Sequence, residues 1–408
     1  MTQPILAIDG GKPQREKMLP FGAPFFGQEE LDEVADTLRS GWIGTGPKTK
    51  RFEQEFAEYV GAKYAIALNS CTAGLHLSLV VSGIGPGDEV IVPALTFGAT
   101  ANVVEHAGAR PVLVDIDPVS LTIDVSSAAR ALSPRTRAIM PVHYAGMPCD
   151  LDAVHALADA HQLVVIEDAA HAIGTIYHGR KVGALSPLTS FSFYANKNLS
   201  TAEGGMVTTN DAALEEKLRV YHLHGLSRDA WKRYHVKTYL PPEIMVPGFK
   251  YNMTDIQASL GIHQLHKQEA FIARREEIAS FYDRAFAELG DIVWTQPRPH
   301  DVGSRGEPLN RHVLHLYPIL IDTDQLRVDR NQVLSALLAE NIGVSMHFNP
   351  LHQMPYYRDK YGYAPNDLPN AHRVGEREIS LPVQPQITDH DAQDVVDAVK
   401  KVLDAYRR

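Results

Sequence analysis

The chain has 408 residues, of which 44% are hydrophobic, so it is long enough to bury a large core and to form two or three domains. It contains two cysteines, Cys71 and Cys149, which disfavours a disulfide framework and predicts a reducing, cytoplasmic setting. Acidic residues (49) outnumber basic residues (39), and the formal net charge is -10. Since basic clusters and long apolar stretches are also lacking, neither a nucleic acid nor a membrane is an expected partner.

Five apolar, β-branched segments predict the strands of a buried sheet. They cover residues 64–68, 89–92, 111–114, 137–142 and 163–166. Helix-like segments lie between them, for example 73–81 after Thr72 and 151–160 after Asp150. Strands that alternate with helices, and that are apolar on both faces, are typical of an α/β fold with a mainly parallel sheet covered by helices.

The second half of the chain shows a different pattern. Residues 189–194 and 205–209 predict two further strands with no helix between them, so we expect a mixed sheet. From Met253 to about Leu289 the apolar spacing is helical, over a length that predicts a break or bend. A smaller α+β unit follows, and we expect a large domain over 1–265 and a small domain over 266–408. The elements predicted for the small domain are strands at 315–321 and 343–347 and helices at 330–340 and 389–406.

Ligands of open parallel sheets bind beyond the carboxyl ends of the strands, so polar residues at strand ends are the first candidates for a site. Residues 69–74 leave the first strand and open a helix, where free N–H groups and the hydroxyls of Ser70 and Thr72 favour an anion. An ordinary helix cap is the alternative interpretation of this segment.

Glu167 and Asp168 end the fifth strand. Neighbouring strand residues face opposite ways, so only one of these carboxylates enters a given site, where an Asp would hold a cationic nitrogen. A helix cap or a surface charge pair is the alternative, and His171 alone would be a structural histidine. Lys197 follows another apolar strand, and a lysine in a desolvated site has a lowered pKa and forms Schiff bases. In isolation it would be a surface residue.

Together these segments supply the parts that pyridoxal 5′-phosphate needs: a lysine for its aldehyde, a carboxylate for its ring nitrogen and an anion site for its phosphate. The sequence resembles the DegT/DnrJ/EryC1/StrS family of pyridoxal-phosphate-dependent sugar aminotransferases, which have the large and small domains of fold type I. The similarity runs from about Leu19 to the end of the chain. The segments that carry it are residues 40–47, 72–74, 87–93, 141–146, 202–205 and 248–258.

The resemblance implies a role for each matching residue. Lys197 forms the Schiff base and carries the proton, and Asp168 pairs with the ring nitrogen. His171 lies on the side of the phenolic oxygen, and Phe97 stacks on the ring, with plain core packing as its alternative. The residues implied for the phosphate site are Cys71, Thr72 and Ser192.

The resemblance also implies a homodimer, because a polar side chain of the partner subunit completes the phosphate site in this family. Lys250 and Asn252 are the two candidates, and the sequence does not choose between them. His347 matches a position near the substrate, with a structural histidine as the alternative.

The implied reaction is ping-pong transfer of the amino group of L-glutamate to a nucleotide-linked keto sugar. Within the family, the sequence is most similar to the UDP-4-amino-4-deoxy-L-arabinose–oxoglutarate aminotransferases, which favours a 4-keto sugar on UDP. The sequence leaves open the sugar, the nucleotide, amination at C3 or C4, and glutamine as the donor.

Three other functions have weaker support. Asp115 and Asp117 after an apolar strand could hold the divalent ion of a nucleotide-sugar glycosyltransferase, although a polar loop is the simpler interpretation and we expect no metal. The glycine-rich segment 83–87 lies before a strand instead of after one, which disfavours a dehydrogenase. A non-catalytic regulator that binds the cofactor is disfavoured by the presence of Lys197 and Asp168 together.

Overall fold

The computed structural model describes residues 5–226, 243–299, 301–304 and 306–408. Its centre is a seven-stranded sheet in the order β1-β9-β8-β5-β4-β2-β3, in which β9 alone runs antiparallel to its neighbours. The expected mixed, mainly parallel sheet is therefore confirmed. The strands are β1 (Tyr64–Leu68), β2 (Glu89–Pro93), β3 (Arg110–Val114), β4 (Thr136–Ile139), β5 (Val164–Asp168), β8 (Leu188–Ser192) and β9 (Gly205–Thr209).

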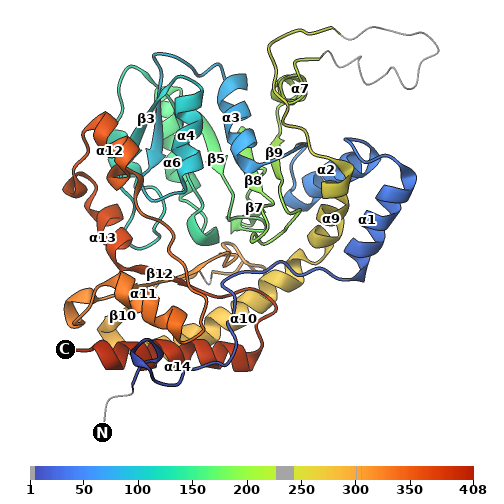
Figure 1. Ribbon diagram of the computed structural model, residues 1–408. Coiled ribbons are helices and arrows are strands. Elements are labelled where there is room, and N and C mark those ends of the chain that lie inside the picture. Colours follow the sequence, from blue (N-terminus) through green and yellow to red (C-terminus); the bar gives the residue numbers. More distant parts are fainter. Residues whose placement is uncertain (1–4, 227–242, 300, 305) are drawn as a thin grey trace.

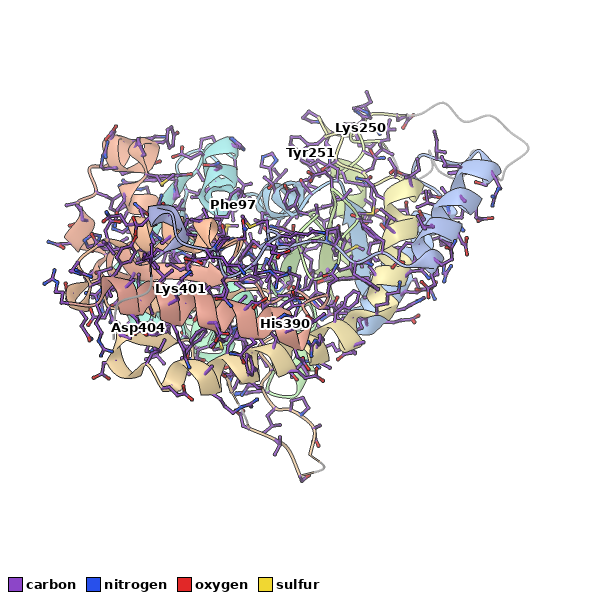
Figure 2. The ribbon with its side chains drawn as sticks, turned by 60° about the horizontal axis from the view of Figure 1, so that its bottom comes forward. Phe97, Lys250, Tyr251, His390, Lys401 and Asp404 are labelled. Atoms are coloured by element: carbon purple, nitrogen blue, oxygen red, sulfur yellow. The ribbon has the colours of Figure 1, made fainter. Side chains whose placement is uncertain are left out.

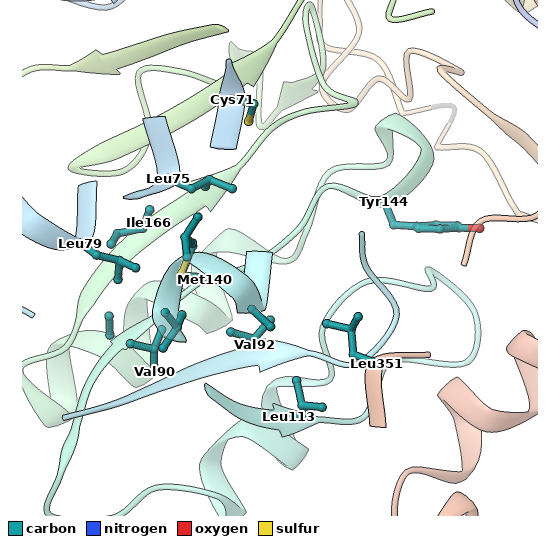
Figure 3. Close-up of a cluster of buried hydrophobic side chains, with 14 of the residues drawn as sticks. Cys71, Leu75, Leu79, Val90, Val92, Leu113, Met140, Tyr144, Ile166 and Leu351 are labelled. Carbon is teal, nitrogen blue, oxygen red and sulfur yellow. The ribbon is translucent and has the colours of Figure 1, made fainter. Parts of the chain in front are cut away.

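Helices cover both faces of this sheet, which explains why every residue of β2, β8 and β9 is buried (Figure 1). Val90 and Val92 of β2 pack in the cluster that contains α3 and α4, whereas Ile91 packs with α5 and α6 on the other face. Figure 3 shows part of the first cluster, with Leu75 and Leu79 against Val90 and Val92. The helices are α3 (Cys71–Val81), α4 (Gly98–His106), α5 (Val125–Arg130), α6 (Leu151–His161) and α7 (Ala212–Tyr221).

The long helical stretch predicted from Met253 is interrupted at Lys267. It forms α9 (Asp255–His266) and α10 (Gln268–Ala287), and Lys267 between them is the C-cap of one helix and the N-cap of the other. Helix α9 packs against α1 (Gln28–Ser40) and α2 (Pro47–Val60) beside the central sheet. Helix α10 leads from there to the small antiparallel sheet at the bottom of Figure 1.

The C-terminal part of the chain is built on this small sheet, which has the order β10-β11-β12. Its apolar cluster also takes in Leu6 and Leu19, so the N-terminal segment packs against C-terminal elements. A division near residue 265 stays a prediction. The elements are β10 (Val293–Thr295), β11 (Tyr317–Ile321), α11 (Arg330–Ala339), α12 (Pro355–Tyr361), α13 (Pro369–Arg377), β12 (Glu378–Leu381) and α14 (Asp389–Tyr406). Short elements are β6 (Ile176–Tyr177), β7 (Arg180–Lys181) and 3-10 turns at Ala7–Asp9, Tyr144–Gly146, Gly290–Ile292, Thr323–Gln325, Leu351–Gln353 and Pro365–Asp367.

Two predicted elements need correction. The strand expected at 343–347 does not form, because Gly343 donates its N–H to the carbonyl of Leu19 and only Ser345 makes a bridge to β12, at Ser380. The helix expected from residue 73 begins at Cys71 with Ser70 as its N-cap. Within the described residues, no helix has the length and apolarity that crossing a membrane requires.

Candidate active site

Lys197 lies in the loop that follows β8, and this loop is fixed by backbone hydrogen bonds. Its N–H donates to the carbonyl of Tyr194, and the N–H of Thr201 donates to the carbonyl of Phe193, both at 2.9 Å. Lys197 is partly exposed as a residue, but burial of its amine lowers the pKa to about 8, against the opposing charges of Cys71 and Asp168. A much larger fraction of the amine is therefore neutral near physiological pH than in a solvated lysine, and the neutral amine is the nucleophile.

Asp168 is the last residue of β5, and its carboxylate is buried. It accepts hydrogen bonds from the hydroxyl of Thr100 (2.8 Å) and from the N–H of Ala170 (3.1 Å). Burial raises the pKa of Asp168, and these bonds and the charge of Lys197 only partly oppose that effect. No cationic side chain of the described residues forms an ion pair with Asp168, so a protonated ring nitrogen would supply the missing partner.

The start of α3 provides hydrogen-bond donors for an anion. The Ser70 side chain accepts the N–H of Ala73 at 3.1 Å, whereas the N–H groups of Cys71 and Thr72 have no acceptor within the helix. Gly205 of β9 lies against this turn, and a Cβ atom there would come within 2.5 Å of the Cys71 nitrogen. Glycine is therefore required at 205 for the strand to approach the donors.

Two serines of β8 lie beside this turn. Ser190 and Ser192 are two residues apart, so they face the same side of the strand. The hydroxyl of Ser190 is buried and has no hydrogen-bond partner among the described residues, and a Cβ atom on Gly74 of α3 would lie 3.0 Å from it. Ser192 was expected here, but Ser190 was missed, because one serine within an apolar strand carries no signal of its own.

Three histidines surround Lys197. His171 accepts the N–H of Ala145 at its Nδ1 (3.2 Å), which leaves the proton on Nε2. His315 lies with its ring centroid 4.4 Å from that of His171, and its Nε2 is 3.4 Å from the Lys197 amine. The Nδ1 atom of His315 is 3.0 Å from the amide oxygen of Asn198, so the neutral ring directs a lone pair at the amine. Sequence reasoning missed His315 and Asn198, since an isolated histidine in a strand pattern resembles a core residue.

His347, the third histidine, is partly exposed and stacks on Phe21 with the ring centroids 5.3 Å apart. Burial, helped by the nearby charge of Lys197, lowers its pKa to about 3, so the ring is neutral. Phe97 precedes α4 and is 64% exposed, which excludes plain core packing in this chain and leaves its ring available.

Lys250 and Asn252 lie together in one small cluster. The N–H of Asn69 donates to the carbonyl of Tyr251 at 2.7 Å, which places this segment beside the start of α3. Lys250 is exposed at the margin of the molecule (Figure 2), and its amine donates to the Asn252 side chain at 2.5 Å. Asn252 in turn donates to Thr45 at 2.6 Å. The structure thus places both candidates close together and does not choose between them.

Asp115 and Asp117, the candidates for a metal site, are occupied by backbone groups. Asp115 accepts the N–H groups of Asn370 and Ala371 at 3.0 and 2.8 Å and so anchors the start of α13. Asp117 accepts two N–H groups of its own turn. The described residues contain no group of three or more His, Cys, Asp and Glu side chains that could hold a metal ion. The interpretation as a polar loop accounts for these carboxylates.

The residues present therefore fit pyridoxal phosphate. The buried carboxylate without a cation, the lysine with a lowered pKa and the free donors at α3 match the ring nitrogen, the aldehyde and the phosphate of this cofactor. The unpartnered hydroxyl of Ser190 indicates that this part of the site is built for a ligand.

Comparison with known proteins gives the same result. The spore coat polysaccharide biosynthesis protein SpsC of Bacillus subtilis is 47% identical over 96% of this chain and 98% of its own. The putative sugar aminotransferase Spr1654 of Streptococcus pneumoniae has been solved in PLP and PMP forms. Its PMP form is 34% identical and has a TM-score of 0.86 over 94% of this chain and 98% of its own. DesI, solved in the presence of its TDP-sugar product, is 29% identical with a TM-score of 0.85 over 98% and 96%.

The sequence model of the DegT/DnrJ/EryC1/StrS aminotransferase family matches residues 24–400. This match covers both the residues around Lys197 and the C-terminal elements. The chain thus belongs to the DegT/DnrJ/EryC1/StrS aminotransferase family and is a pyridoxal-phosphate-dependent enzyme that transfers an amino group to a sugar.

Proposed function

We propose that the chain transfers the amino group of L-glutamate to a nucleotide-linked keto sugar, with a UDP-linked 4-keto sugar as the first candidate. The observation that carries the proposal is the buried amine of Lys197, whose pKa is lowered to about 8, held among Asp168 and three neutral histidines. Two relatives support the substrate class. DesI was solved with a TDP-sugar product, and SpsC is named for polysaccharide biosynthesis.

The cofactor supplies an aldehyde that bonds to amines and a ring that withdraws electrons from the carbon losing a proton. Lys197 would hold the cofactor through that aldehyde, and its amine, when free, would take and return the proton at the reacting carbon. Acid–base catalysis of this kind contributes about 10²- to 10⁴-fold to a rate. His315 accepts a hydrogen bond from the amine and so directs its lone pair away from the histidine.

Asp168 keeps the ring nitrogen protonated, and Thr100 and Ala170 hold its carboxylate in place. Cys71 and Thr72 donate their N–H groups to the phosphate, and the hydroxyl of Ser192 adds a side-chain donor.

The remaining contacts orient the cofactor and the sugar. Phe97 stacks on the ring, where an exposed aromatic side chain would become covered. His171, with its proton on Nε2, donates to the phenolic oxygen. His347 faces the sugar substrate with a neutral ring.

The active enzyme is a cytoplasmic homodimer in this proposal. Lys250 and Asn252 are exposed or partly exposed, and we infer that one of them reaches the phosphate site of a second copy. Replacing each residue separately by Ala and measuring cofactor affinity identifies the one that does.

The test is the absorption spectrum of the pyridoxal-phosphate-loaded protein before and after addition of L-glutamate. Conversion of the yellow lysine-bound form to the pyridoxamine form establishes glutamate as the donor. UDP- and TDP-linked 4-keto sugars are then offered to the pyridoxamine form, and recovery of the yellow band identifies the acceptor. If the yellow band changes with L-glutamine but not with L-glutamate, the proposed donor is wrong. If the yellow band does not return with either sugar, the proposed acceptor is wrong.

A further inference from the structure

Glu378 and Ser380 are two buried polar residues on β12 that the proposed reaction does not yet use. They alternate with Ile379 and Leu381, which belong to the apolar cluster of the small sheet. Residues two apart in a strand share a face, so Glu378 and Ser380 point together to the other side of β12. Both have 0% exposure.

The carboxyl group of Glu378 has no ion pair within the described part of the chain, although an arginine lies close to it. The guanidinium of Arg330 donates instead to the backbone carbonyls of Glu378 (2.8 Å) and Gly375 (3.0 Å). Burial therefore raises the pKa of Glu378 to about 8, against the opposing effects of Ser380 and His347. A buried carboxyl group without a cation destabilises a fold, which indicates a role beyond stability.

Both hydrogen-bond partners of this carboxyl group lead to His347. One carboxylate oxygen accepts the backbone N–H of His347 at 2.7 Å. The other lies 2.5 Å from the hydroxyl of Ser380, and that hydroxyl lies 2.8 Å from Nδ1 of His347. The hydroxyl of Tyr144 donates to the carbonyl of His347 and fixes the other side of the residue. The Nε2 atom is the ring nitrogen left for a ligand.

The hydrogen-bonded series Glu378–Ser380–His347, which we call the relay, has two arrangements of protons. When Glu378 is ionised, Ser380 donates to it and accepts from Nδ1 of His347, so Nε2 carries a lone pair. When Glu378 is protonated, it donates to Ser380, which donates to Nδ1, so Nε2 carries a proton. The state of a buried acid thereby decides whether the ring nitrogen without a protein partner among the described residues, Nε2, accepts or donates a hydrogen bond.

We propose that Glu378 and Ser380 are positioning residues that set the hydrogen-bonding role of His347 Nε2 toward the sugar substrate. The inference rests on the proposed function in one respect, namely that His347 contacts the sugar.

The groups packed around the relay make Glu378 its titrating member. Burial holds the pKa of Tyr144 well above its usual range and the pKa values of His171 and His315 well below theirs, so none of the three changes charge near neutral pH. Arg330 stays cationic. Lys197 does titrate near pH 8 when free, so the test uses the pyridoxal-phosphate-loaded protein, in which this amine is bonded.

Diethylpyrocarbonate is a suitable probe because it reacts with an unprotonated ring nitrogen. If Nε2 carries the proton, the lone pair of Nδ1 is engaged by Ser380, and His347 is protected. Labelling of His347 is followed by peptide mass spectrometry relative to the exposed His161 in the same sample. With a pKa of about 8, the ratio should rise by about tenfold from pH 7 to pH 9 in the wild type.

Glu378→Gln should abolish this rise. The amide oxygen would accept the N–H of His347, which leaves the amide N–H group to donate to Ser380 as a protonated acid does. Labelling of His347 should therefore stay low at every pH. Ser380→Ala should remove the pH dependence by breaking the chain, and Ser380→Thr, which keeps the hydroxyl, should restore it.

Glu340→Gln is the matched control. Glu340 is also fully buried and lies before the same segment, but it binds the N–H groups of Ala7 and Gln14 and not His347. The Glu340→Gln variant should keep the rise in labelling of His347 from pH 7 to pH 9. A rise that persists in Glu378→Gln, or is lost in Glu340→Gln as well, would overturn the relay.

Steady-state kinetics separates this inference from the proposed function. With a UDP- or TDP-linked 4-keto sugar, Glu378→Gln should change KM for the sugar by about fivefold to tenfold, as expected for one altered hydrogen bond, and leave KM for glutamate unchanged. If labelling follows the prediction and KM for the sugar does not move, the relay stands and the assignment of His347 to the sugar is wrong. If the labelling prediction fails while both substrates turn over, the proposed function stands and the relay is wrong.

Discussion

Glu167 and Asp168 are adjacent at the end of β5, and both carboxylates are buried, but the strand sends them to opposite sides. Glu167 accepts from His143 at 2.7 Å and from Thr189 at 3.1 Å. Burial alone would raise the pKa of Glu167, but these bonds and the histidine outweigh it and lower the pKa. In the part of the chain that the structure describes, Asp168 accepts hydrogen bonds from Thr100 and a backbone N–H alone, and its pKa is raised.

The difference separates a structural acid from a functional one. The protein satisfies Glu167 with its own groups, so this carboxylate contributes to stability. Asp168 has no cationic partner among the described residues, so a bound ligand would supply the positive charge that balances this carboxylate. The same contrast distinguishes Glu378 from Glu340, which pairs with Lys401 at 2.7 Å.

Asp168→Asn gives the largest expected effect. The amide oxygen can accept the N–H of Ala170 while the amide NH2 group donates to the Thr100 hydroxyl, but the side chain carries no charge for the ring nitrogen. The kcat of the loaded enzyme should therefore fall by about 100- to 1,000-fold, the usual cost of losing one preorganised electrostatic partner. The cofactor-free variant should be at least as stable as the wild type, because a buried unpaired carboxyl group is removed. Single-turnover kinetics and thermal unfolding measure the two effects. A variant with full activity would contradict the role of Asp168.

Glu167→Gln should show the reverse pattern. Its amide weakens the bonds to His143 and Thr189, so the free energy of unfolding should fall by about 1–3 kcal/mol in urea titrations, with kcat nearly unchanged. Because the pKa of Glu167 is lowered in the folded state, its contribution is present above the usual carboxyl pKa and is lost as the pH falls through the lowered value. The stability difference between variant and wild type should therefore shrink in acid. A large loss of kcat in a stable variant would make Glu167 functional.

Thr100→Val tests how much the hydrogen bond from Thr100 to Asp168 contributes to catalysis. The change keeps the shape but removes the hydroxyl that donates to the carboxylate at 2.8 Å, and kcat should fall by about tenfold. Thr208→Val is the control, since Thr208 is also buried and donates to the carbonyl of Gly183 at 2.7 Å, on another side of the sheet. Equal losses in both variants would indicate a general packing defect.

The pH dependence of cofactor attachment reports on Lys197. Its pKa is lowered to about 8, so the neutral amine becomes scarcer below that value. The rate at which the cofactor-free protein gains its yellow band should fall by about tenfold per pH unit below pH 8 and level off above it. A rate that keeps rising to pH 10 would indicate an ordinary, solvated lysine.

Local sequence patterns predicted much of the fold correctly. The bounds of β1, β9 and α14 match the ranges expected from periodicity, because each element is read from its own spacing and caps. The expected strand at 343–347 was wrong, since its hydrogen bonds go to Leu19 and to the side chain of Glu378, which lie far away in sequence.

The residues of the candidate site were likewise predicted only in part from the sequence. Lys197 and Asp168 were predicted from their positions at strand ends and from the family resemblance. His315, Asn198 and Ser380 were missed, because each acts through a contact that spans more than 30 residues. A single sequence does not record such pairs.

Borohydride reduction of the pyridoxal-phosphate-loaded protein, followed by peptide mapping, tests the central claim most directly. Reduction fixes the cofactor to the lysine that binds it. The account predicts one labelled peptide, the peptide that contains Lys197, and no label or yellow band in Lys197→Ala, which should also lose turnover. A label on Lys250 or another lysine, or turnover of Lys197→Ala near the wild-type rate, would contradict it.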